Sequence, residues 1–172
     1  MTFSLFHPVI LLFFPAAMAM AASMDLLTMT IPNRLCMALA VGYLVLAIAV
    51  GVPAHAILYN LSCGLVVLAL TFALFSLGWI GGGDAKLAAA TAMWLGWGAI
   101  ADYGLSSAIY GGVLTLAIIV ARRISLPAWM SAQGWIARLH NAKTGIPYGI
   151  ALAVAGIMVY PQTQVWQALS IH

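Results

Sequence analysis

Long apolar stretches, separated by short breaks that contain polar residues, glycine or proline, dominate this chain. A helix needs roughly 20 apolar residues to cross the hydrocarbon core of a bilayer. The apolar runs are continuous rather than alternating, which favours helices over the strands of a transmembrane barrel. The pattern therefore predicts an all-α, polytopic membrane protein with six spans, at about residues 4–24, 35–52, 54–78, 85–101, 103–121 and 146–168.

Small residues distinguish the fourth and fifth predicted spans. The fourth is rich in alanine and glycine, which let neighbouring helices approach closely, so we expect it to lie at the centre of the bundle. In the fifth, Gly104, Ala108 and Gly112 recur at intervals of four and share one helix face. This row predicts a close contact with another helix.

The composition supports a membrane protein and excludes other classes. The chain is 65% apolar and 5% charged, against about 45–50% and about 25% for soluble domains. So few charges cannot solvate a soluble globule, and intrinsic disorder needs low hydrophobicity with high charge. The basic residues are scattered, so no patch for nucleic acid is expected. The two cysteines lack the C-x-x-C spacing of a zinc site.

The basic residues predict how the spans are oriented. They lie in the loops after the first, third and fifth predicted spans, at Arg34, Lys86, Arg122, Arg123, Arg138 and Lys143. Six alternating spans place these loops on one side, which the positive-inside rule makes cytoplasmic. We therefore expect both termini to be periplasmic, and residues 1–172 to form a single membrane-embedded domain.

The longest loop contains a further predicted element, over the cytoplasmic residues 125–141. Pro127 can begin a helix there, with Ser125 as its N-cap. We expect this short helix to lie in the membrane interface, anchored by Trp129 and Trp135.

Three aspartates are the chain's only acidic residues. Asp102 falls in a predicted outer turn, where we interpret it as a solvated loop or capping residue. Asp25 ends the first predicted span and Asp84 opens the fourth, so both lie at the cytoplasmic edge at the same depth. Ionisable groups at membrane depth are costly and are typical of functional sites. Singly, Asp84 could be a helix N-cap and Asp25 an interfacial residue, but their shared depth favours a pair.

Two carboxylates a few ångströms apart cannot both ionise easily, so such a pair shares one proton. The pair can hydrolyse a peptide with no metal or cofactor. The ionised carboxylate takes a proton from water, and its protonated partner stabilises the oxyanion. Because the pair titrates as a unit, acid and base are not assigned separately. Glycines at 81–83 would let an extended substrate backbone approach Asp84.

Three motifs resemble those of the type IV prepilin peptidases, which are intramembrane aspartic proteases with a G-x-G-D pattern. They are Asp25 followed by Ile31-Pro32-Asn33, then Gly81-Gly82-Gly83-Asp84-Ala85-Lys86-Leu87, and finally Pro147-Tyr148-Gly149. The small size is similar to that of the short members that process Flp-type (tight-adherence) prepilins. The resemblance implies a multi-pass endopeptidase of the bacterial inner membrane that cuts basic leader peptides from prepilins on the cytoplasmic side.

The resemblance matches Asp25 and Asp84 to the family's catalytic aspartates. It implies that the remaining motif residues shape the site: Gly81, Gly82, Gly83, Lys86, Pro32, Asn33, Pro147, Tyr148 and Gly149. Lys86 lies two residues beyond Asp84, on a different helix face, and we interpret it mainly as a cytoplasmic anchor. We expect Pro32 to break the chain before the second span, Asn33 to satisfy backbone groups there, and Pro147 to mark a helix start. The expected partners are prepilin substrates and the lipid bilayer, without a metal, a cofactor or nucleic acid.

A membrane carrier or proton-coupled channel is the alternative, with Asp25 and Asp84 binding cations or relaying protons. Carriers typically place such acids near the bilayer midplane. Both aspartates lie instead at a predicted membrane edge, which favours the peptidase. A scaffold whose acids only cap helices is a third hypothesis. An Asp84→Asn variant separates it from the peptidase, because asparagine caps nearly as well as aspartate.

Overall fold

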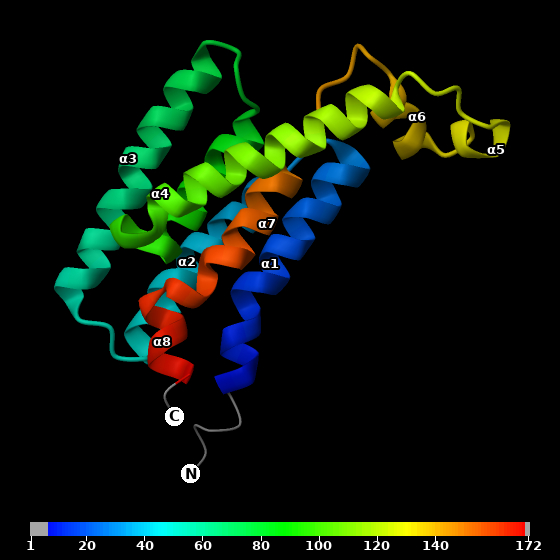
Figure 1. The fold of residues 1–172 in the computed structure, drawn as a ribbon. Coiled ribbons are helices and arrows are strands. Elements are labelled where there is room, and N and C mark those ends of the chain that lie inside the picture. Colours follow the sequence, from blue (N-terminus) through cyan, green and yellow to red (C-terminus); the bar gives the residue numbers. More distant parts are fainter. Residues whose placement is uncertain (1–6, 171–172) are drawn as a thin grey trace.

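A computed structural model describes residues 7–170, with side chains over residues 11–168, and every regular element in that range is a helix. The elements are α1 (His7–Thr28), α2 (Asn33–Ala49), α3 (Ala54–Ser76), α4 (Gly82–Ala121), α5 (Ala128–Ser131), α6 (Gly134–His140), α7 (Gly149–Val159), the 3₁₀ turn η2 (Tyr160–Gln162) and α8 (Gln164–Ser170) (Figure 1). The all-α prediction is confirmed.

Three of these helices, α1, α3 and α4, are long and apolar enough to cross a membrane, and two shorter apolar helices cover Asn33–Ala49 and Gly149–Gln162. The count of six spans therefore stays a prediction. So does the periplasmic location of the termini, because residues 4–6 of the first predicted span and both chain ends lie outside the described residues.

The helix α4 is broken at Gly96, where φ is 66° and ψ is −179°. This backbone conformation is essentially restricted to glycine. In Figure 1 both ends of α4 lie in the upper half of the view, while the bend lies lower, beside α3. The predicted boundary between the fourth and fifth spans, near residue 102, was therefore wrong. Asp102 lies exposed within the helix rather than in a turn. Hydropathy missed the break because the residues around Gly96 are themselves apolar.

The part of α4 before this break forms the centre of the bundle, as predicted from its small residues. Every residue from Leu87 to Gly96 is buried, and α4 packs against α2, α3 and α7. The Trp94 ring contacts the rings of Phe14 and Tyr160, and its Nε1 donates a hydrogen bond to the Leu39 carbonyl over 2.9 Å.

The small-residue row predicted in the second part of α4 does not pack against another helix of the described chain. Gly104, Ala108 and Gly112 are all exposed. The buried row lies one position earlier, at Tyr103, Ser107 and Gly111, and it faces the residues that lead into α7. Spacing by four is common to both rows, so spacing alone could not choose between them.

Two predicted helices in the C-terminal third are interrupted. The helix predicted over 125–141 is two short helices, because the first ends at Ser131 and the second begins at Gly134. The N-cap of the first is Pro127 rather than the expected Ser125. The last predicted span, 146–168, begins at Gly149 and is interrupted by the 3₁₀ turn at Tyr160–Gln162. This turn contains Pro161, which lacks the N–H that an α-helix needs.

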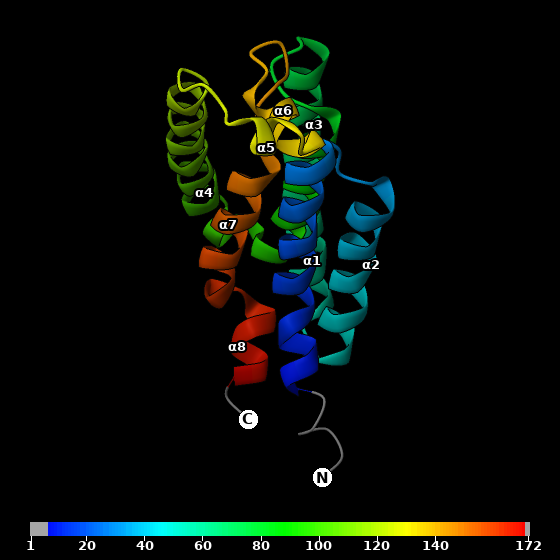
Figure 2. The same cartoon turned by 90° about the vertical axis from the view of Figure 1, so that its right-hand side faces the viewer.

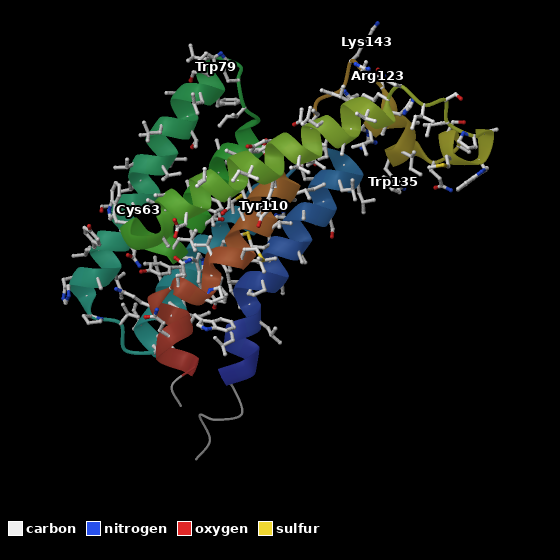
Figure 3. The ribbon with its side chains drawn as sticks, in the orientation of Figure 1. Cys63, Trp79, Tyr110, Arg123, Trp135 and Lys143 are labelled. Atoms are coloured by element: carbon white, nitrogen blue, oxygen red, sulfur yellow. The ribbon has the colours of Figure 1, made fainter. Side chains whose placement is uncertain are left out.

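The two ends of the molecule differ in charge. The segment between α4 and α7, which carries the labelled Arg123 and Lys143, lies at the upper end in Figure 3. The start of α1 and the helix α8 lie at the opposite end in Figures 1 and 2. Within the upper segment Trp129 is 71% exposed and Trp135 is 37% exposed. Exposed tryptophans are typical of a segment that rests in a membrane interface.

Candidate active site

Asp25 lies in the last turn of α1 and is only 6% exposed. Its Oδ2 accepts a hydrogen bond of 2.7 Å from the backbone N–H of Gly149, the first residue of α7. The helix ends just beyond it, where the Met29 N–H donates to the Asp25 carbonyl over 2.8 Å and Met29 takes a φ of 55°. The carboxyl is therefore positioned by two chain segments rather than by α1 alone.

Ile31 connects all three motifs. A Cβ on Gly83 would lie 3.2 Å from the Ile31 Cβ, and a Cβ on Gly149 would lie 2.8 Å from its Cδ1. The buried Ile31 side chain therefore fills the space between the start of α4 and the start of α7. A side chain on Gly149 would displace Ile31, and one on Gly83 would require a smaller shift of it.

Asp84 is the third residue of α4, whose N-cap is Gly81, so its interpretation as an N-cap was wrong. Its half-buried side chain turns back towards the Gly81 backbone, and Oδ2 would lie 2.9 Å from a Cβ on residue 81. A carboxylate in this position faces the free N–H groups of a helix start. The missing side chain of Gly81 leaves room for the carboxyl on that side.

Ile31 places the two aspartates at one site, although 59 positions separate them in the sequence. Its side chain packs against Gly83, the neighbour of Asp84, and against Gly149, whose N–H donates to Asp25. Tyr103 and Tyr148 also lie within electrostatic range of Asp84. Among the described residues, no third acid, histidine or cysteine joins the aspartates to complete a set of metal ligands. The arrangement is a pair of carboxyls with two tyrosines in their electrostatic surroundings.

The third motif is held against the second part of α4. The Tyr148 hydroxyl donates a hydrogen bond of 3.0 Å to the Ser107 carbonyl. Its ring occupies the space that a side chain on Gly111 would need. Pro147, expected at a helix start, is fully buried two residues before α7 begins. These contacts fix where the Gly149 N–H points.

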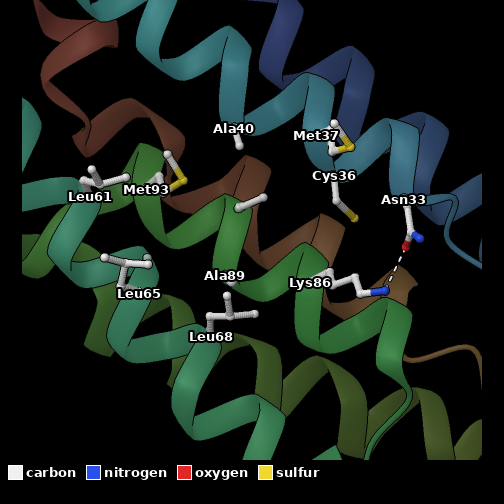
Figure 4. Close-up of a pocket in the computed structure, with 12 residues that line it drawn as sticks. Asn33, Cys36, Met37, Ala40, Leu61, Leu65, Leu68, Lys86, Ala89 and Met93 are labelled. Carbon is white, nitrogen blue, oxygen red and sulfur yellow. Dashed lines mark hydrogen bonds between the residues drawn. The ribbon is translucent and has the colours of Figure 1, made fainter.

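Lys86 and Asn33 lie together at the edge of the site. The Lys86 Nζ donates a hydrogen bond of 2.8 Å to the Asn33 Oδ1, which joins α4 to α2 (Figure 4). Asn33 therefore accepts a bond from a side chain, where we expected it to satisfy backbone groups. Pro32 is the N-cap of α2, so the expected chain break before the second helix is confirmed.

The sequence did not predict the contacts of two arginines that hold the segment between α4 and α7 near the site. Arg138 donates from Nη1 to the Leu27 carbonyl over 2.8 Å, 111 positions away. Arg122 donates from Nε to the Leu139 carbonyl over 2.8 Å and from Nη2 to the Gly145 carbonyl over 3.1 Å. Their acceptors are backbone carbonyls, which carry no sequence signal.

Comparison with known proteins adds one positive finding. No curated protein and no solved structure matches the chain significantly. The model of the type IV leader peptidase family matches residues 12–120, a range that includes both Asp25 and Asp84 but ends before the third motif. The apolar helices agree with a membrane protein of this kind. Because the match covers more than half of the sequence, the chain belongs to the type IV leader peptidase family.

Proposed function

We propose that this protein is a membrane aspartic endopeptidase that removes the basic leader peptide from type IV prepilins, with Asp25 and Asp84 as its catalytic pair. The observation that supports the proposal is that both aspartates lie beside one side chain, Ile31. It packs against Gly83, next to Asp84, and against Gly149, whose N–H donates to Asp25. Such a pair, built from segments far apart in the sequence, has the chemistry that peptide hydrolysis requires.

In the proposed reaction one carboxylate removes a proton from water, and the water oxygen attacks the scissile carbonyl carbon. The protonated partner donates a hydrogen bond to the developing oxyanion. The carbon–nitrogen bond then breaks, and a proton passes to the leaving amine. The Gly149 N–H occupies one lone pair of Asp25 Oδ2, so we expect Asp25 to exchange its proton mainly through Oδ1. The pair acts as a unit, in which either member can start as the base.

The charge distribution indicates the face of the membrane at which the substrate is cut. The basic residues Arg123 and Lys143 lie at the end opposite to α8 (Figure 3), which supports a cytoplasmic location for that end under the positive-inside rule. Both aspartates sit beside the loops of the same end, after α1 and before α4. We propose that the prepilins are of the small, Flp-like kind and that cleavage takes place at the cytoplasmic face of the bacterial inner membrane.

The alternative, a carrier or proton-coupled channel that uses the same acids, is not favoured because the chain belongs to a peptidase family.

The test is co-expression with a small prepilin, followed by N-terminal sequencing of the pilin. The Asp25→Asn and Asp84→Asn variants should each lower cleavage by at least about 100-fold, since a proton-transfer group contributes roughly 10²–10⁴ to a rate. Asp102→Asn is the matched control because Asp102 is the third acid and is exposed. All three variants should reach the membrane fraction in wild-type amounts. Persistent cleavage by either catalytic variant would show that the assignment is wrong.

A further inference from the structure

A groove of about 380 Å³ lies between α2, α3 and the first part of α4, and it meets the candidate active site only at Lys86 and Asn33. Its walls include Cys36 and Ala40 from α2, Leu61 and Leu65 from α3, and Met93 from α4 (Figure 4). Neither Asp25, Asp84 nor Ile31 contributes to it. The groove therefore needs an explanation of its own.

The polar groups of the groove are gathered at one end. Lys86 and Asn33 stand there, joined by their 2.8 Å hydrogen bond, while most of the remaining lining is apolar (Figure 4). Asn33 is the first residue of α2 and Lys86 is the fifth of α4, and both helices start at the end of the bundle that carries the basic residues. Along the helices, the groove lining changes from the Lys86 ammonium group at one end to apolar side chains.

The ammonium group of Lys86 has a neutral partner. Among the described side chains no carboxylate forms an ion pair with it, and the amide of Asn33 holds it over the groove. A lysine near a membrane surface can extend its charge into water, but this one is tethered across two helices. The site is therefore complementary to an anion at the membrane edge.

The groove opens sideways between the helices. Met37 and Leu65, which line it, are 65% and 59% exposed. In a membrane protein, side chains exposed on this surface face lipid chains. An occupant can therefore enter from within the bilayer.

We propose that this groove binds an anionic phospholipid, with the phosphate at Lys86 and an acyl chain against Ala40, Leu65 and Met93. Basic pockets between membrane helices on the cytoplasmic side commonly hold anionic head groups. The proposal does not depend on peptidase activity.

The test uses the full chain in phosphatidylcholine vesicles that contain a trace of spin-labelled phosphatidylglycerol or spin-labelled phosphatidylcholine. Electron paramagnetic resonance measures the fraction of each lipid that the protein immobilises. Lys86→Met should lower the preference for phosphatidylglycerol by about fivefold, the factor that corresponds to about 1 kcal/mol per basic residue near the surface. Lys86→Arg should retain the preference.

Two further variants make the result specific. Lys143→Met removes the same charge from the exposed loop, away from the groove, and should change the preference by less than about twofold. Ala40→Leu places extra carbons in the groove and should reduce immobilisation of both lipids. Equal effects of Lys86→Met and Lys143→Met would overturn the proposal, because the preference would then come from net charge. An unchanged preference in Lys86→Met would overturn it as well, and is the result expected if the groove takes a protein segment.

Discussion

The backbone N–H of Gly149 donates a hydrogen bond of 2.7 Å to Oδ2 of Asp25, across 124 positions of sequence. A Cβ on Gly149 would lie 2.7 Å from that same oxygen and 3.1 Å from the Asp25 Cβ. The close approach of the backbone to the carboxyl therefore depends on glycine, which has no side chain to keep them apart. This contact ties the third motif to one of the two proposed catalytic groups.

Gly149→Ala should displace the Asp25 carboxyl and lower kcat/KM for leader cleavage on the order of 100-fold, since misplacing a catalytic group by about 1 Å has an effect of this size. The measurement is cleavage of a purified prepilin in detergent, at several substrate concentrations. Gly112→Ala is the control, because a Cβ there would meet open space. Wild-type activity in Gly149→Ala would contradict the positioning role.

Gly96 offers a test of the break in α4. Alanine at this position must adopt a φ of 66°, and its Cβ would collide with the side chain of Asn60. We expect Gly96→Ala to lower the free energy of unfolding by about 1–3 kcal/mol from the backbone alone, with an additional loss from the collision. Thermal and denaturant unfolding in detergent would measure this change.

A double variant separates the two causes. Adding Asn60→Ala to Gly96→Ala should recover the part of the loss that comes from the collision, measured against Asn60→Ala alone. Gly98→Ala, two residues away and facing open space, should not lower stability, because alanine favours a helix more than glycine does. If Gly96→Ala proved as stable as Gly98→Ala, the sharp bend would not be part of the fold.

Arg122 should hold the segment between α4 and α7 in place. Its guanidinium donates to the carbonyls of Leu139, Thr144 and Gly145, and hydrogen bonds from charged groups contribute about 1.5–3 kcal/mol each. The loss of even one such hydrogen bond in Arg122→Met should increase the fraction of molecules in which the segment between α4 and α7 is detached by roughly 10- to 100-fold. Limited proteolysis of the purified protein would report this as faster cleavage within residues 139–148. The neighbouring exposed Arg123 provides the control variant Arg123→Met, which should be cut at the wild-type rate.

The arrangement of the two aspartates requires the loop after α1 and the loop before α4 to lie on one side of the membrane. The variants Thr30→Cys and Trp79→Cys, made one at a time, each place a reactive cysteine in one of these loops. Gln164→Cys places one in α8 at the other end. In spheroplasts an impermeant maleimide should label only the position in α8. The other two should react after permeabilisation.

The native Cys36 and Cys63 are buried, so the unmodified protein measures background labelling. Labelling of the Thr30 and Trp79 positions from opposite sides would exclude a shared site for the aspartates. Labelling of both from the periplasmic side would preserve the site but reverse its orientation.

Much of the architecture could be predicted because hydropathy is a local property of the chain. The apolar runs predicted helices at α1, α2 and α3 close to their observed positions, and alanine and glycine in the fourth run predicted its central place. The sequence positions of Asp25 and Asp84 indicated a pair, since both residues lie at the same predicted edge of the membrane. The family match over residues 12–120 agrees with the first two of the three motifs that suggested it.

Tertiary structure decided the features that depend on which surfaces meet. Hydropathy could not locate the bend at Gly96, because its cause is a backbone conformation next to Asn60 rather than a polar break. Spacing could not choose the buried row at Ser107 and Gly111, because the neighbouring row has the same period. The contact of the Gly149 N–H with Asp25 could not be read from the sequence either. Such contacts arise only when helices distant in sequence pack together, and packing depends on shape at atomic distances rather than on the polarity of a segment.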